Sequence, residues 1–232
     1  MRVFFIAAFI TLSLGAAQPP GGAAPTAKAS APIDITGYWV AFVTEDWRFR
    51  MITPRKGDYQ PVPMTDQARK IADAWDPAAD EAAGNQCKAY GAGAIMRLAA
   101  RFHITWQDDN TLRVESDSGM QTRLFHFNAA APPGERTWQG YSTAQWERPS
   151  SLKVATSNLR AGYLRKNGVP YSENAAVTEY FDLAPIPGGG QVLLVTAIVD
   201  DPQNLRQPFT TSSQFKKEAD GSKWDPTPCA AK

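Results

Sequence analysis

The sequence predicts an all-β fold, an antiparallel β-barrel of about ten strands with one short helical insert. Three observations carry this prediction. Short β-branched and aromatic runs recur between residues 35 and 217, turn-forming residues separate them, and the sequence shows neither βαβ alternation nor an internal repeat. The 232 residues are enough for one large β domain, which we place at residues 33–232.

The N-terminus has the pattern of a secretory signal peptide. Arg2 precedes an uncharged apolar run that ends in the small residues Gly15-Ala16-Ala17, so cleavage is expected after Ala17. The run is shorter than the ~20 residues needed to cross a bilayer, so we expect no membrane span after cleavage. Residues 18–32, rich in Ala, Pro and Gly, have too little apolar surface to offset their ordering entropy. They are predicted to be a disordered spacer.

Export also governs how the two cysteines are interpreted. Cys87 and Cys229 would reach an oxidising compartment, periplasmic or extracellular, where an even cysteine count favours a disulfide. Two cysteines without a nearby histidine cannot form a structural zinc site, and we expect no metal and no cofactor. The formal charge of +1 gives no electrostatic case for a nucleic-acid partner.

The first two strands are expected at residues 35–44 and 47–52. The former stretch is β-branched and aromatic, which is typical of a central strand. The latter alternates, and as a strand it would place Arg48 and Arg50 on one face and Trp47 with two further apolar side chains on the other. Such a strand would be half exposed or would line a polar barrel lumen.

The helical insert is expected at about residues 65–84. Thr65 can cap a helix whose apolar residues recur at helical spacing. Asp76-Pro77 starts a second short helix, with Asp as the cap and Pro at the first helical position, and Gly84 ends it.

Eight more strands complete the predicted barrel. They are expected at residues 102–107, 111–115, 121–127, 142–147, 152–157, 177–183, 192–199 and 209–217. Residues 158–173 contain two glycines and a proline and are predicted to be a long loop. Long loops in compact domains are often functional.

Two patterns resemble known families. Gly37-Tyr38-Trp39 resembles the Gly-x-Trp motif of lipocalins and other calycins, which implies that Trp39 closes the barrel floor. A longer pattern resembles a widespread family of secreted bacterial proteins with no established activity. It comprises Cys87, Gly91, Met96, Trp138-x-Gly140-x-Ser142-x3-Trp146-Glu147, Leu152-x-Val154-x-Thr156, Gly168-x-Pro170-x-Ser172-Glu173, Glu179, Asp201-Pro202 and Pro208. This chain has Arg148-Pro149 where that family has Gly-Asp, and the resemblance supplies no catalytic residues.

Histidine and glutamate are the candidates for acid–base chemistry. His103 and His126 both lie in predicted strands, and either could act with Glu147 or Glu45. The alternative is that both histidines are hydrogen-bonded residues of the barrel wall or core.

Arginine and aromatic residues are the candidates for ligand binding. Arg48 and Arg50 could converge on a carboxylate or pair with Glu147, and Arg123 occupies a further strand position. Aromatic side chains that line a barrel suit a flat apolar or sugar ligand, which adds Trp47, Trp146 and Tyr141 to the site. The alternative is a structural ion-pair network with aromatic residues that form the core.

Three functions remain open at this point. The first is a secreted or periplasmic barrel that binds a small, mostly apolar or aromatic ligand oriented by Arg48, Arg50 and Glu147. The second is an acid–base hydrolase, lyase or isomerase on the same barrel. The third is an envelope protein with a protein partner and no pocket. We predict that Arg48, Arg50, Glu147 and one histidine line a single pocket.

Overall fold

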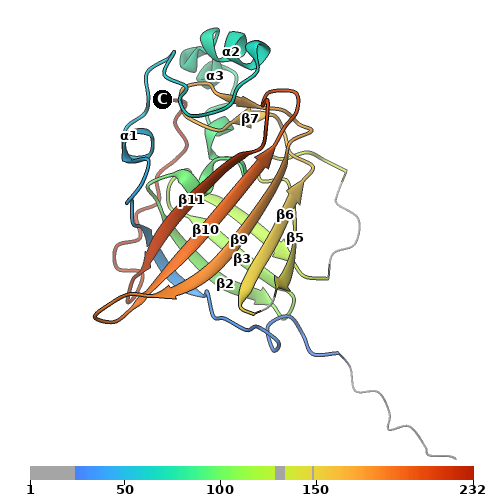
Figure 1. Cartoon of the computed structure of the whole chain (residues 1–232), viewed down its shortest axis with the longest axis vertical. Helices are drawn as coiled ribbons and strands as arrows, with labels where there is room; N and C mark the ends of the chain where they lie inside the picture. Colours follow the sequence, from blue (N-terminus) through green and yellow to red (C-terminus); the bar gives the residue numbers. More distant parts are fainter. Residues whose placement is uncertain (1–23, 129–133, 148) are drawn as a thin grey trace, which may run out of the picture.

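A closed nine-stranded barrel forms the body of the protein (Figure 1). A computed structural model describes residues 24–128, 134–147 and 149–232 of the chain. The order of strands around the barrel is β1-β11-β10-β9-β6-β5-β4-β3-β2. Their bounds are β1 Gly37–Ala41, β2 Arg101–Asp108, β3 Thr111–Ser116, β4 Gln121–His126, β5 Tyr141–Glu147, β6 Ser151–Ser157, β9 Ala176–Pro185, β10 Gln191–Asp200 and β11 Phe209–Lys217. The predicted all-β barrel is confirmed.

One strand pair departs from the antiparallel prediction. β4 and β5 run parallel, with Phe125 opposite Ser142 and His126 opposite Thr143, so the barrel is mixed. Parallel neighbours need a long crossover instead of a tight hairpin. The chain between β4 and β5, residues 127–140, supplies it.

The barrel interior is filled by side chains from every strand. Inward positions alternate along each strand, and the buried core has at its centre Trp39, which is fully buried and donates its indole N–H to the carbonyl of Ile35 at 2.9 Å. The core also contains Phe102, Ile104, Leu112, Val114, Phe125, Leu152, Val154, Phe181, Leu193, Val195 and Phe215. Because side chains fill the barrel interior, a ligand site is expected at one of the barrel ends.

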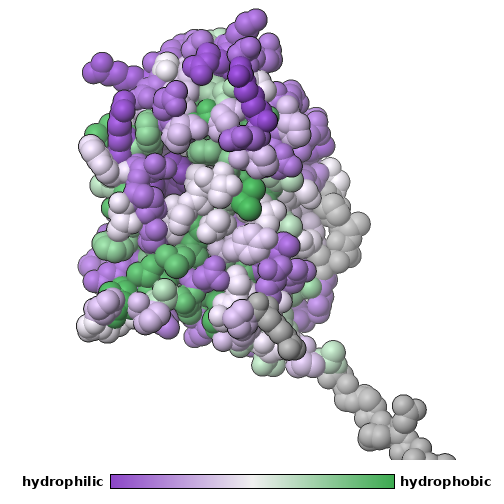
Figure 2. Space-filling view, in the orientation of Figure 1, coloured by the Kyte–Doolittle hydropathy of each residue, from purple (hydrophilic) through white to green (hydrophobic). Residues whose placement is uncertain are grey.

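The two ends of the barrel differ. The upper end in Figure 1 carries η1 (Lys88–Tyr90), η2 (Ile95–Arg97), the helices α2 (Asp66–Asp73) and α3 (Pro77–Ala82), and the small hairpin of β7 (Gly162–Tyr163) and β8 (Pro170–Tyr171). On the face seen in Figure 2, hydrophilic side chains cover most of this end, and apolar ones gather lower down over the barrel strands. The helical insert therefore gives the barrel a polar upper end.

The helical insert forms as the sequence predicts. The hydroxyl of Thr65 accepts the backbone N–H of Ala68, and the carboxylate of Asp76 accepts that of Ala78 with Pro77 at the first helical position. These caps satisfy N–H groups that a helix start leaves free. Within the predicted loop 158–173, the structure adds the β7–β8 hairpin.

The prediction of a strand at residues 47–52 is wrong. Trp47–Arg50 forms the short helix α1, in which the N–H groups of Phe49 and Arg50 bond to the carbonyl of Asp46. Asp46 has a left-handed φ of 50°, which turns the chain out of the extended conformation. Most apolar residues of the segment stay outside, since Trp47 is 63% exposed and Met51 60%, whereas Phe49 is half-buried. A six-residue alternation without a sheet partner does not specify a strand.

The predicted spacer is ordered over residues 26–32. Residues 26–30 form a turn at the lower end of the barrel, where Ala27 donates its N–H to the side chain of Asn110 and accepts the indole N–H of Trp146 at 2.8 Å. This contact with a partly buried aromatic cluster offsets the ordering entropy that the composition alone could not. The predicted signal peptide, residues 1–17, lies outside the described residues.

The predicted disulfide is confirmed. Cys87 and Cys229 are joined, with their Cα atoms 5.1 Å apart. The bond ties the segment after α3 to the C-terminal tail. In the described part of the chain, no helix is long and apolar enough to cross a membrane.

Candidate functional site

A cavity of about 220 Å³ is lined in part by residues of α1. Figure 1 shows this helix beside the upper end of the barrel. The walls of the cavity come from four segments that are far apart in the sequence: α1 with the residues that follow it, η1 and η2, Ser118 in the turn between β3 and β4, and residues 164–166. Its basic lining residues are Arg50, Arg97, Arg165 and Lys166, and its apolar ones include Phe49, Ile52, Leu98 and Leu164. We call it the arginine cavity.

Arg50 enters the cavity from α1. Its side chain is fully buried, its Nε donates to the carbonyl of Arg97 at 3.1 Å, and its Nη1 lies 3.4 Å from the carboxylate of Glu45. Burial lowers the pKa of Arg50, the nearby Arg97 lowers it further, and Glu45 and Asp46 offset part of the effect. The helix thus turns one arginine inward.

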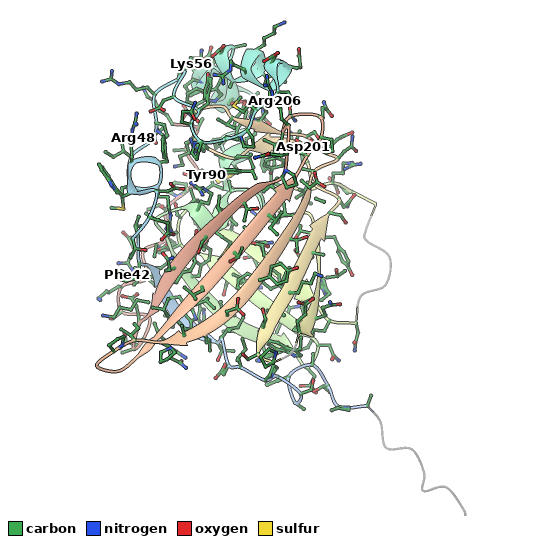
Figure 3. All side chains as sticks on the ribbon, viewed as in Figure 1. Phe42, Arg48, Lys56, Tyr90, Asp201 and Arg206 are labelled. Atoms are coloured by element: carbon green, nitrogen blue, oxygen red, sulfur yellow. A yellow bond between two sulfur atoms is a disulfide. The ribbon has the colours of Figure 1, made fainter. Side chains whose placement is uncertain are left out.

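Arg48 takes the opposite direction from the same helix. Its side chain is 64% exposed and pairs with Asp58 at 2.6 Å. Figure 3 shows it at the outer edge of the molecule. Arg48 and Arg50 therefore do not share a face, because α1 is a helix and not the strand that the alternation suggested.

Arg97 comes from η2, directly before the strand β2. Its Nη2 bonds to Asp46 at 3.1 Å, and its guanidinium lies over the ring of Phe209 at 5.5 Å. Asp46, the residue with the left-handed backbone, thus both starts α1 and holds Arg97.

Arg165 comes from the loop between β7 and β8. Its guanidinium stacks over the ring of Phe49 at 4.3 Å, and its Nη1 donates to the carbonyl of Gln60 at 2.6 Å. Burial lowers the pKa of Arg165 to about 10, with repulsion from Arg97 as the next cause. Its neighbour Lys166 lies over the ring of Tyr90 at 4.4 Å and donates to the Tyr90 hydroxyl.

Each of the three arginines has at least one guanidinium nitrogen that forms no hydrogen bond with a described residue. Four of their buried nitrogen atoms have no hydrogen-bond partner among the described residues: Nη2 of Arg50, Nη1 of Arg97, and both Nε and Nη2 of Arg165. Buried polar groups are nearly always hydrogen-bonded, and charged ones lose most when they are not. The cavity therefore has the chemistry of an anion-binding site.

The other predicted site residues lie elsewhere. His103 stacks on Tyr38, with ring centroids 4.0 Å apart, and its Nδ1 is 3.5 Å from the carboxylate of Glu115. His126 stacks on Tyr141 at 4.9 Å. Both histidines have aromatic neighbours on the barrel wall, and neither lines the arginine cavity.

Glu147 and Trp146 belong to the lower end of the barrel. Glu147 pairs with Lys153 at 3.2 Å instead of with an arginine, and Trp146 packs against Trp106 and Phe127. Of the predicted candidates, the structure brings together only Arg50 and Glu45 at the cavity. The predicted single pocket of two arginines, Glu147 and a histidine is wrong, because those residues lie on different faces and ends.

Arg123 is buried inside the barrel and already has a partner. It forms two hydrogen bonds with Glu179, at 3.0 and 2.6 Å, and a third with Thr156. Both charged side chains are essentially inaccessible to solvent. This bidentate pair is the arrangement expected of a structural ion pair.

Sequence reasoning missed Arg97, Arg165 and Lys166. Arg97 is a single charge within an apolar run, residues 92–100, which could have marked it as a buried cation. Arg165 and Lys166 lie in the loop that was expected to be functional for its length. No group of three or more His, Cys, Asp or Glu side chains in the described residues is placed to hold a metal ion.

The chain matches no known family model, and it resembles no curated protein and no solved structure. The resemblance to a family of secreted bacterial proteins stays a prediction. The function is therefore argued from the cavity itself.

Proposed function

We propose that the protein is an exported binding protein for a small anionic ligand with an apolar or aromatic body, held in the arginine cavity. The observation that carries the proposal is the set of four buried guanidinium nitrogens without a partner in the described chain. A buried donor that is left without a hydrogen bond costs about 1–3 kcal/mol, and more on a charged group, so four such nitrogens around one cavity are expensive unless a ligand pairs with them.

The apolar lining supports a ligand that is more than an inorganic ion. Phe49 and Leu98 line the cavity, while Met51 and Ile52, also in its wall, are 60% and 62% exposed. Exposed large apolar side chains beside a charged pocket suit the body of an amphipathic ligand. The anionic group would enter among the arginines, and the body would cover these side chains.

The cavity favours binding over acid–base catalysis. Arginine stays protonated at neutral pH and cannot serve as a general base. The histidines proposed for that role contact Tyr38 and Tyr141 outside the cavity. The disulfide supports a periplasmic or secreted location, because such bonds persist in oxidising compartments.

Native mass spectrometry of the protein purified from its own cells tests this proposal. We expect a small anionic molecule to remain bound to the wild type and to the Arg48→Gln variant, and to be lost from Arg165→Gln. Arg48 is the matched control, because it lies on α1 but is exposed and paired with Asp58. Equal occupancy of the wild type and Arg165→Gln would place any ligand outside the cavity.

A further inference from the structure

We infer that the arginine cavity selects a doubly charged tetrahedral oxyanion, the phosphoryl group of a phosphate monoester, over a carboxylate. This inference rests on the proposed function and concerns the chemical class of its ligand. It follows from the three separate segments that supply the free donors, from the charges that lack an ion-pair partner and from the size of the cavity.

The donor geometry begins with Arg165. Its Nη1 is occupied by the carbonyl of Gln60, whereas its Nε and Nη2 are free. These two nitrogens form one edge of the planar guanidinium, and that edge binds two oxygens of one oxyanion at once. Arg165 therefore supplies a bidentate contact.

Two more donors come from other sides of the cavity. Arg50 enters from α1 and Arg97 from η2, and each has one free nitrogen, Nη2 and Nη1 respectively. A carboxylate has two oxygens in one plane, both of which Arg165 alone would satisfy. A phosphoryl group has three terminal oxygens in different directions, which suits donors that come from three separate guanidinium groups.

The charges around the cavity favour a dianion. Arg50 and Arg97 each have a carboxylate, from Glu45 at 3.4 Å and Asp46 at 3.1 Å. Among the described residues, Arg165 and Lys166 have no carboxylate within ion-pair distance, and Asp46 and Asp58, which attract Arg165 from further away, are themselves paired with Arg97 and Arg48. The cavity and its surroundings therefore have two more positive than negative charges. A phosphate monoester carries about −1.5 to −2 at neutral pH, and a carboxylate carries one negative charge.

The size of the cavity limits the ligand. About 220 Å³ is below the roughly 300–1,000 Å³ of pockets that enclose drug-sized molecules. The cavity can enclose a phosphoryl group and a few attached atoms. The rest of the ligand would lie on the exposed side chains of Met51 and Ile52.

Isothermal titration calorimetry with three phenyl compounds tests the inference. Phenyl phosphate is a tetrahedral dianion, benzenesulfonate a tetrahedral monoanion and benzoate a planar monoanion, so the body is constant and only the anionic group changes. At pH 7.5 and low salt we expect phenyl phosphate to bind at least about tenfold more tightly than either of the others. Its affinity should fall as the pH is lowered through about 6, where the second phosphate proton binds, and that of benzenesulfonate should not.

Variants assign the effect to the cavity. Arg165→Gln should weaken phenyl phosphate binding by about 10- to 150-fold, as expected for the loss of hydrogen bonds to a charged group. Arg48→Gln should bind like the wild type. Circular dichroism of each variant confirms that it is folded. Arg97→Lys, which keeps the positive charge but removes the branched guanidinium, serves as a second variant.

The outcomes distinguish the proposed anion site from the inferred preference for a dianion. If benzoate or benzenesulfonate binds as tightly as phenyl phosphate, and Arg165→Gln weakens that binding, the dianion inference is wrong and the proposed anion site stands. If none of the three compounds binds the wild type, or if Arg165→Gln leaves their binding unchanged, both proposals are wrong.

Discussion

Two buried arginines of this protein should respond in opposite ways to the same substitution. Arg123 and Arg165 are both shielded from solvent, but Arg123 is paired with Glu179 and Arg165 has no carboxylate partner among the described residues. A structural arginine stabilises the fold, whereas an arginine kept for a ligand weakens it until the ligand binds. Replacing each by methionine, which preserves much of the apolar stem, distinguishes the two cases.

The cost of Arg165 can be worked out from its pKa. Burial and repulsion from Arg97 lower the pKa of Arg165 from its ordinary value above about 12 to about 10. At about 1.4 kcal/mol per pKa unit, the folded protein gives up roughly 3 kcal/mol to keep this group charged. Since the lowered pKa is still far above neutral pH, the whole cost is present at pH 7 and would be relieved only as the pH rises above about 10.

Arg165→Met removes this cost and introduces a smaller one. The carbonyl of Gln60 loses its donor, which costs about 1–3 kcal/mol, and a thioether replaces the guanidinium over Phe49 with a comparable ring contact. Without ligand, the variant should therefore be about as stable as the wild type or up to ~2 kcal/mol more stable. Arg123→Met should instead lose about 3–5 kcal/mol, because it leaves the carboxylate of Glu179 buried and unpaired.

Urea unfolding followed by circular dichroism measures both changes, with the disulfide intact and without added anions. Phenyl phosphate at about 100 times its wild-type dissociation constant should then raise the free energy of unfolding of the wild type by about 2.7 kcal/mol, and that of Arg165→Met, if its binding is about 10- to 150-fold weaker, by only about 0.3–1.4 kcal/mol. A loss of more than about 3 kcal/mol in Arg165→Met without ligand would refute the reasoning, since Arg165 would then be structural like Arg123.

Three further predictions concern the disulfide and the buried tyrosines Tyr163 and Tyr171. Cys87→Ser with Cys229→Ser removes a bond across 142 residues and should lower the free energy of unfolding by up to about 5 kcal/mol, measured in urea, with no further loss when reductant is added. Burial raises the pKa of Tyr171 and of Tyr163, so the contribution of these two tyrosines to stability should be constant below the ordinary tyrosine pKa of about 10 and fall as the pH rises above it, as pH-dependent urea unfolding would show. Tyr171→Phe should reduce that alkaline loss and cost less than about 1 kcal/mol at pH 7, because the hydroxyl has no hydrogen-bond partner among the described residues; a larger loss at pH 7 would contradict this.

Most of the fold was predictable because its signals are local. Alternation in strands such as β6 and β10 gives the inward face directly, and Thr65 and Asp76 mark the helix starts through their own caps. The parallel β4–β5 pair was not predictable, since it depends on where a long connection leads the chain. The helix α1 was missed because a six-residue stretch can fit both the strand periodicity and the helix periodicity. Tertiary contacts then decide which of the two structures forms.

Most of the candidate site could not be predicted from the sequence, because it also depends on tertiary structure. Arg50, Arg97 and Arg165 are separated by 47 and 68 residues, and only the closed barrel brings their segments together. Arg50 lines the cavity, but it was chosen from an alternation that predicted the wrong element and the wrong partner, Glu147. A cavity built from dispersed segments at the end of a barrel leaves no contiguous motif in the sequence.

The C-terminal tail gives this dispersed site a rigid base. The Cys87–Cys229 bond fixes the tail beside η1, where the hydroxyl of Tyr90 accepts the N–H of Ala230 and also a hydrogen bond from Lys166. Figure 3 places Tyr90 inward from α1, between the exposed Arg48 and the barrel. One tyrosine thus joins the covalent link to a cation of the cavity wall. Because an ordered wall loses less conformational entropy when a ligand binds, the disulfide would preorganise the cavity for the proposed ligand as well as stabilise the fold.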